Sequence, residues 1–127
     1  MEYMYLAEEG NIEVLRKIHG IIAATLPYRV VSRPTLGKMV ISHTDTLLGK
    51  KANLNEVLAT HCEVEVDGNP GFGCISGNEP ERAEYAAIID SLMWNEHPAL
   101  EKIRPLINEI RNEIYLKWQN RHLELCV

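Results

Sequence analysis

One stretch of the sequence decides the fold: residues 54–93 read LNEVLATHCEVEVDGNPGFGCISGNEPERAEYAAIIDSLM. Its first half predicts two β-strands joined by the turn Asp67-Gly68-Asn69-Pro70, because Asp and Asn tolerate turns and Gly supplies a positive φ. A helix is predicted directly after the glycine-rich second strand. Such a junction presents backbone N–H groups at the positive end of a helix, where an anion can sit.

The rest of the N-terminal half predicts one helix and further short strands. Asn11 fits an N-cap, and apolar residues then recur at helical spacing as far as Leu26, just before Pro27. The later segments are rich in β-branched residues or alternate between apolar and polar residues, as half-buried strands do. The predicted elements are a helix over 11–26, strands over 29–33, 36–43, 57–66 and 71–76, and a loop over 44–52.

Two helices are predicted in the C-terminal half. The first covers about residues 80–94, with Asn78 as its N-cap and Glu81 three residues later, as in a capping box. The second covers about residues 98–125 and contains Pro105, which either kinks the helix or starts its main part. We therefore expect an α+β fold with an N-terminal helix, about four antiparallel strands and two C-terminal helices, the last one long.

Composition excludes several classes of protein. The chain of 127 residues is 46% hydrophobic, which is enough for one core, and we expect a single domain over residues 1–127. A net charge of −5 argues against a nucleic-acid binder, which needs a basic face. No apolar run is long enough to span a membrane, and the acidic N-terminus differs from a signal peptide. A cytoplasmic protein without a membrane or nucleic-acid partner is therefore expected.

The glycine-rich junction is the candidate anion site. Backbone N–H groups at this turn could hold a phosphate, with an arginine in the first helical turn facing it. The alternative is that the glycines only permit a tight strand and a strand-to-helix turn. The pattern lacks the lysine of a Walker motif and fits no dinucleotide fingerprint. The candidate anion-binding residues are Gly71, Gly73, Gly77, Asn78 and Arg82.

Other chemistry is not supported by the sequence. The five histidines form no HExxH or other close ligand pair, so no metal is predicted. Cys62 and Cys74 fall on predicted strands rather than at a helix N-terminus, where a thiolate would be stabilised. Asp90 lies near the apolar face of its helix and either binds a ligand or meets water at the border. No catalytic residue is therefore assigned, and no cofactor is expected in this chain.

The last helix carries a narrow apolar seam that steps by threes and fours. It is either ordinary core or the contact with another subunit. The helix would be about 30 Å long from Pro105, whereas a domain of this size has a radius of gyration near 14 Å. We therefore expect the seam to face a partner. The candidate interface residues are Leu100, Ile103, Ile107, Ile110, Ile114 and Trp118.

The chain also resembles a known family, the G subunit of the carbon–phosphorus lyase core complex (the PhnG family). That family shows a strand "G-E-x-x-x-T-x-x-x-V", a "G-x-G" strand ending in Gly, and a helix near "A-E-x-A-A-x-x-D-A-L"; residues 37–41 suit its earlier "G-L-V-M-V" strand. The family usually places a basic residue where this chain has Asn78. The matching residues are Asn55, Glu56, Thr60, Val64, Gly71, Gly73, Gly77, Ala83, Glu84, Ala86, Ala87, Asp90 and Leu92.

The resemblance implies a function. The G subunit works with the H and I subunits in a complex that also holds the radical J subunit. Together they displace adenine from ATP with a phosphonate and form ribose 1-phosphonate 5-triphosphate. The resemblance implies an accessory or scaffolding role for this chain, with ATP as a substrate of the complex, and we also expect a homodimer. The alternative is a stand-alone module that binds a phosphate or nucleotide at the glycine-rich turn.

Overall fold

The computed structural model of the protein describes residues 4–45 and 50–125, with side chains for residues 4–38 and 58–120. Its elements are, in chain order, α1 (Met4–Glu9), α2 (Ile12–Thr25), β1 (Tyr28–Asp45), β2 (Lys50–Val66), β3 (Asn69–Ser76), α3 (Pro80–Trp94) and α4 (Leu100–Leu125). The α+β class, the long last helix and the antiparallel sheet are confirmed. No helix in the described part of the chain is long and apolar enough to cross a membrane.

The sheet has three antiparallel strands in the order β1-β2-β3, not four. Residues 29–33 and 36–43 belong to one strand, because β1 continues through Pro34. The register shifts between Val30 and Ser32 and again between Ser32 and Thr35, so β1 carries extra residues there. An edge strand accommodates a proline and such bulges without losing its only ladder. The sequence break at Pro34 therefore marks a bulge and not a turn.

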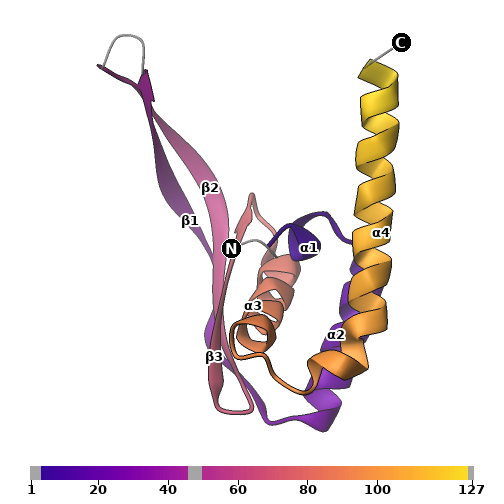
Figure 1. Ribbon diagram of the computed structural model, residues 1–127. Coiled ribbons are helices and arrows are strands. Elements are labelled where there is room, and N and C mark those ends of the chain that lie inside the picture. The colour runs from indigo at the N-terminus through magenta and orange to yellow at the C-terminus, as the bar shows by residue number, and fades with distance from the viewer. Residues whose placement is uncertain (1–3, 46–49, 126–127) are drawn as a thin grey trace.

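The predicted loop over 44–52 is also largely wrong. Its first two and last three residues lie in β1 and β2, and residues 46–49 lie outside the described residues. β3 pairs with β2 only from Ala59 to Val66. The strands β1 and β2 continue past that point as a two-stranded ribbon, which we define as residues 38–45 and 50–58. Figure 1 shows the ribbon extending away from the helices.

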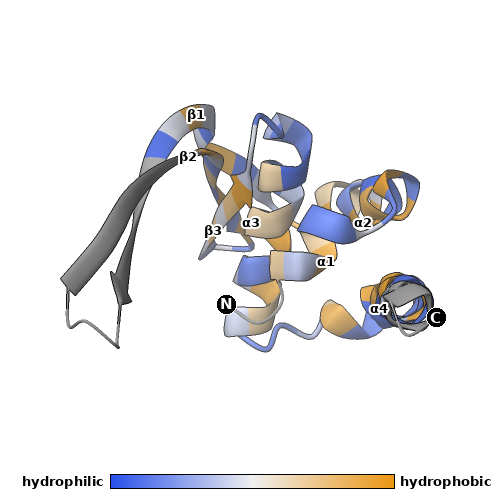
Figure 2. Ribbon diagram, turned by 90° about the horizontal axis from the view of Figure 1, so that it is seen from above, coloured by the Kyte–Doolittle hydropathy of each residue, from blue (hydrophilic) through white to orange (hydrophobic). Residues whose placement is uncertain are grey.

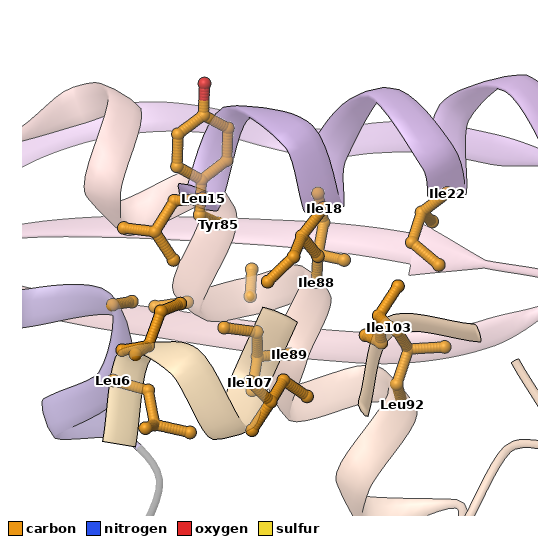
Figure 3. Packing of buried hydrophobic residues seen from close by; sticks show 14 of the residues in the cluster. Leu6, Leu15, Ile18, Ile22, Tyr85, Ile88, Ile89, Leu92, Ile103 and Ile107 are labelled. Atoms are coloured by element: carbon orange, nitrogen blue, oxygen red, sulfur yellow. The ribbon is translucent and has the colours of Figure 1, made fainter. Parts of the chain in front are cut away.

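Helix α3 forms the middle layer of the molecule. It lies against β2 and β3 on one side and against α1 and α2 on the other, and α4 packs beside α1 and α2 (Figure 1 and Figure 2). Eight of its residues are buried, on all sides of the helix, as expected for a helix enclosed by other elements. Figure 3 shows the core that results, in which Ile18 and Ile22 of α2 and Ile103 and Ile107 of α4 meet α3.

The N-terminal region holds two helices where one was predicted. Asn11 caps α2 as expected, since its Oδ1 accepts a hydrogen bond from the Glu13 N–H at 2.8 Å. The additional helix α1 has only six residues, too few to produce a clear periodic pattern. Its buried residues, Leu6 and Ala7, join the same core. The position of α1 therefore depends on tertiary contacts and not on helix propensity.

Candidate functional site

The glycines of β3 allow the strand and α3 to touch backbone to backbone. A Cβ on Gly71 would collide with the Ala87 carbonyl oxygen, and a Cβ on Gly73 with the Ala83 carbonyl oxygen. The Ala87 nitrogen would also lie only 2.7 Å from a Gly73 Cβ. Both glycines are buried. They face the helix and hold it close, so they offer no surface to an anion.

The junction between β3 and α3 (residues 77–82) uses its backbone donors internally. Gly77 has φ +83°, which requires glycine, and its N–H donates to the Leu58 carbonyl oxygen at 2.7 Å. The buried Thr60 hydroxyl donates to the Gly77 carbonyl at 2.6 Å and accepts from the Glu79 N–H at 2.9 Å. Thr60 of β2 therefore caps the junction from the neighbouring strand.

The N-cap of α3 differs from the prediction. The cap residue is Glu79 and not Asn78, and the Glu79 side chain makes no cap hydrogen bond. Asn78 is exposed. Thr60 takes over part of the role that a cap side chain normally has, because it binds the Glu79 N–H. The predicted capping box is therefore wrong, while the start of the helix at Pro80 is correct.

Arg82 is turned away from the glycine turn. Its Nη1 donates to the carbonyl oxygens of Ala7 at 3.0 Å, Glu8 at 3.3 Å and Gly10 at 2.7 Å, all at the C-terminal end of α1. A guanidinium at this position satisfies carbonyls that have no partner within their own helix. Its Nε also lies 3.9 Å from Glu79 Oε2. Arg82 therefore ties α1 to α3, and the five predicted anion-site residues do not converge on one point.

A polar cluster that the sequence analysis did not single out joins α2 to α3. Arg16 of α2 binds Glu81 with both Nε and Nη2, at 2.7 and 3.2 Å, and the Tyr85 hydroxyl donates to the same carboxylate at 2.7 Å. The hydrogen bonds from Arg16 and then Tyr85 lower the pKa of Glu81 to about 2. Glu81 is therefore ionised at neutral pH, and it makes the start of α3 unfavourable for a second anion.

Aromatic residues continue this cluster toward the sheet. The His19 ring lies edge-on to Tyr28, with ring centroids 5.6 Å apart, and 5.4 Å from the Tyr85 ring. The Tyr28 hydroxyl is buried beside Glu84 without a hydrogen bond of good geometry. Burial, and then the Glu84 charge, raise the pKa of this phenol above its usual range. Burial, and then the hydrogen bond to Glu81, also raise the pKa of Tyr85 above its usual range. Both tyrosines therefore stay protonated at neutral pH and do not act as bases.

The two described cysteines are unreactive thiols. Burial, and then the charge of Glu84, raise the pKa of Cys62 to about 11, and burial also raises the pKa of Cys74. Cys62 is buried and Cys74 is half-buried, and the described part of the chain holds both as free thiols. Neither is stabilised as a thiolate. Among the described residues, no group of His, Cys, Asp or Glu is arranged to hold a metal.

The seam of α4 packs on its own chain. Ile103, Ile107, Ile110 and Ile114 are between 0% and 3% exposed and belong to the core cluster. The interpretation of these four as a partner surface is therefore wrong. The helix is long, but the part that carries these isoleucines packs on α1 and α2, and Ile103 and Ile107 also reach residues of α3 (Figure 3). Leu100 is half-buried against the same core.

Only Trp118 among the predicted interface residues lies at a surface. It is 48% exposed, its ring lies tilted against the Tyr5 ring with centroids 6.1 Å apart, and its Nε1 donates to Glu9 Oε2 at 3.2 Å. Its neighbours Tyr115 and Leu116 are even more exposed. Tyr115 and Trp118 border an open hollow beside α1, which is also lined by Tyr5, Arg111, Asn112 and Ile114. We call Tyr115, Leu116 and Trp118 the distal end of α4.

These contacts define a small α+β protein whose predicted ligand residues hold its layers together and whose ribbon and last helix extend from the body (Figure 1). A family model described as "Phosphonate metabolism protein PhnG" matches residues 2–126. The chain belongs to the PhnG family, which gives it a role in phosphonate metabolism. No curated protein matches the chain.

Proposed function

We propose that this chain is an accessory, scaffolding subunit of the complex that transfers the ribose triphosphate of ATP to a phosphonate with release of adenine. ATP is then a substrate of the assembly, and the H, I and J subunits of the carbon–phosphorus lyase core complex are the partners. Membership of the PhnG family supports this proposal. The chain supplies surfaces for assembly in it, and the reacting groups come from its partners.

The observation that carries the proposal is the pair of extensions from the body. The ribbon begins next to Leu36 and Leu58, which are 45% and 51% exposed, and the distal end of α4 exposes Tyr115, Leu116 and Trp118. Figure 1 shows both extensions on the same side of the molecule. Large apolar side chains that gather at a surface mark contacts with other proteins. Their aromatic character fits the composition of interface cores.

The internal contacts at the junction between β3 and α3 also support a role in assembly. Gly71 and Gly73 hold α3 against β3, Arg82 binds the end of α1, and Thr60 occupies the Glu79 N–H. A stand-alone phosphate-binding module would need these groups to be available to its ligand. The geometry therefore favours assembly over ligand binding as the use of this fold.

Co-expression with the three partner subunits tests the proposal. Leu116→Arg puts a charge on the exposed distal end of α4, so we expect weaker co-purification of the partners and less adenine release from ATP and a phosphonate. Asn108→Arg adds the same charge to an exposed position nearer the N-terminus of α4. It should leave both the co-purification and the adenine release unchanged. Thermal unfolding of each variant alone shows whether the fold is unchanged.

Two results would contradict the proposal. Adenine release by the purified chain alone would assign the reaction to this subunit itself. Full activity of the partner subunits when this chain is omitted would remove its role in the complex.

A further inference from the structure

One flank of α4 stays open beside its buried isoleucine seam. The hollow beside α1, near the distal end of α4, has Arg111 in its lining. A second hollow, nearer the start of the helix, lies between Met93 of α3 and Arg104 of α4, and Arg111 lines it as well. Ile107 and Ile114 lie at the bottom of these hollows, since they are 3% and 1% exposed. The two hollows therefore adjoin at Arg111, and we call them together the α4 groove.

The side chains along this flank repeat with the period of a helix–helix contact. Arg104, Arg111 and Trp118 follow one another at intervals of seven positions, and Tyr115 lies four positions after Arg111. Intervals of seven, divided into steps of four and three, place side chains in one line along a helix. From Arg104 to Trp118 this line is about 21 Å long. It therefore offers room for about four turns of a second helix lying beside α4.

The groove is positively charged, although the chain as a whole is acidic. The net charge of the chain is −5, yet none of the described residues that line the two hollows is acidic. Arg111 is exposed, and no hydrogen bond or ion pair engages it within the described part of the chain. Arg104 binds Glu101 at 2.7 Å, but both side chains are more than half exposed, so this pair contributes little and can be exchanged for another carboxylate.

We propose that the α4 groove binds an acidic amphipathic helix of one of the partner subunits. The inference rests on the proposed role in the phosphonate-processing complex. Carboxylates about one heptad apart on the partner helix bind Arg104 and Arg111, and apolar side chains between them fill the two hollows. Tyr115 and Trp118 extend the contact, because arginine and aromatic side chains are those that anchor protein interfaces.

Other occupants fit the groove less well. A two-fold contact between copies of this chain must match one surface to itself, and this surface presents arginines without carboxylates to receive them. A nucleic acid needs a basic face that neutralises many phosphates, which a chain with a net charge of −5 does not favour. Charge complementarity therefore selects an acidic segment of a different protein.

Competition between two forms of the chain tests the groove. A wild-type chain and a variant, each with its own tag, are co-expressed with the H, I and J subunits, and the ratio of the two in the purified complex is measured by mass spectrometry. Arg111→Glu puts a carboxylate opposite that of the partner helix, so the variant should be depleted about tenfold or more. Lys102→Glu makes the same change of charge at an exposed position outside the two hollows and should compete equally with the wild type. Circular dichroism shows whether each variant is folded.

Photo-crosslinking identifies the occupant. Benzoylphenylalanine in place of Tyr115, an aromatic residue that lines the groove, should link the chain to an acidic helical peptide of the H, I or J subunit. Replacement of an acidic residue of that peptide by arginine should then restore the competition of Arg111→Glu. A crosslink to a second copy, to nucleic acid or to a segment without acidic residues would overturn the proposal, and so would the absence of any crosslink.

The competition also separates this inference from the proposed function. If the wild-type chain assembles with the partner subunits and Arg111→Glu competes equally, or if Lys102→Glu is depleted as strongly as Arg111→Glu, only the assignment of the groove fails. If the wild-type chain does not assemble with them at all, both proposals fail.

Discussion

The three-stranded part of the sheet (residues 28–37, 59–66 and 69–76), which we call the lower sheet, shares the strands β1 and β2 with the ribbon, yet different forces hold the two regions in place. In the lower sheet, β3 adds a third strand, and α3 lies so close that only glycine fits at positions 71 and 73. In the ribbon, no third strand joins the β1–β2 ladder within the described residues, and Leu36 and Leu58 are about half exposed at its base. The lower sheet is therefore fixed by close packing on α3, whereas in the described residues the ribbon is held by the β1–β2 ladder.

Replacement of Gly73 should have the largest effect. In Gly73→Val the new side chain meets backbone atoms of α3 that cannot move independently, so we expect a loss of about 3 kcal/mol or more in the free energy of unfolding. Urea denaturation measures it. Gly20→Ala is the control, because a Cβ there meets nothing within 4 Å and should stabilise α2 by about 0.5–1 kcal/mol. An equal response of the two glycines would refute the close contact between β3 and α3.

The second prediction compares the two parts of α4. Ile110→Ala removes a fully buried side chain and should lower the free energy of unfolding by about 2–5 kcal/mol. Leu116→Ala, at the distal end, should change it by less than about 0.5 kcal/mol. Chemical denaturation of both variants checks this. If Leu116→Ala proved as damaging as Ile110→Ala, the distal end would belong to the core of the chain.

The third prediction concerns the attachment of α1. Arg82→Met removes hydrogen bonds from a charged donor to three carbonyls at the end of α1, which should cost about 1.5–3 kcal/mol. Hydrogen exchange should show residues 4–9 opening before the sheet does. Arg104→Met breaks only an exposed pair with Glu101 and should cost less than about 1 kcal/mol. If the hydrogen exchange of α1 were unchanged in Arg82→Met, the apolar contacts of α1 would be enough to hold it in place.

The smallest expected effect is a pH-dependent change in stability through the pair of Arg16 and Glu81. Glu81 has a pKa of about 2 when folded, against an ordinary value of 4.5, so its contribution is present above pH 4.5 and is lost as the pH falls through about 2. Arg16→Met should lower the urea midpoint slightly at pH 6, with a difference that shrinks toward pH 2. The change is small because both side chains are more than a third exposed. Lys17→Met, on an exposed position of the same helix, should show no such dependence. A difference that stays constant with pH would indicate lost packing.

The sequence predicts the body of the fold well where the periodic pattern is long. The limits of α2 and α3, the hairpin around Gly68 and the long last helix all follow from apolar spacing and turn residues. Pro34 misled the strand prediction, because a proline interrupts a central strand but is tolerated at the edge of a sheet. Whether a strand lies at an edge depends on tertiary structure, which local sequence does not contain.

The candidate site was less predictable. Gly71, Gly73 and Arg82 have the composition of an anion site, but their contacts depend on where α1 and α3 lie. The length of α4 suggested that its seam extends past the core. In the structure, all four isoleucines of the seam belong to the core cluster, together with residues of α1, α2 and α3. Arg16 and Glu81 are 65 positions apart in the sequence, so no local sequence pattern could predict their ion pair.

At β3, the Phe72 N–H donates to Asp90 Oδ2 at 2.8 Å and the Ser91 hydroxyl donates to the Asn69 carbonyl oxygen at 2.9 Å. These bonds affect whether the sheet can grow by adding strands from other copies. A sheet with two unpaired edges can add further copies without limit and form a fibre, whereas a sheet with one unpaired edge stops after a single addition. By occupying backbone groups of β3, these two side chains of α3 reduce the hazard of edge-to-edge aggregation on that side of the sheet.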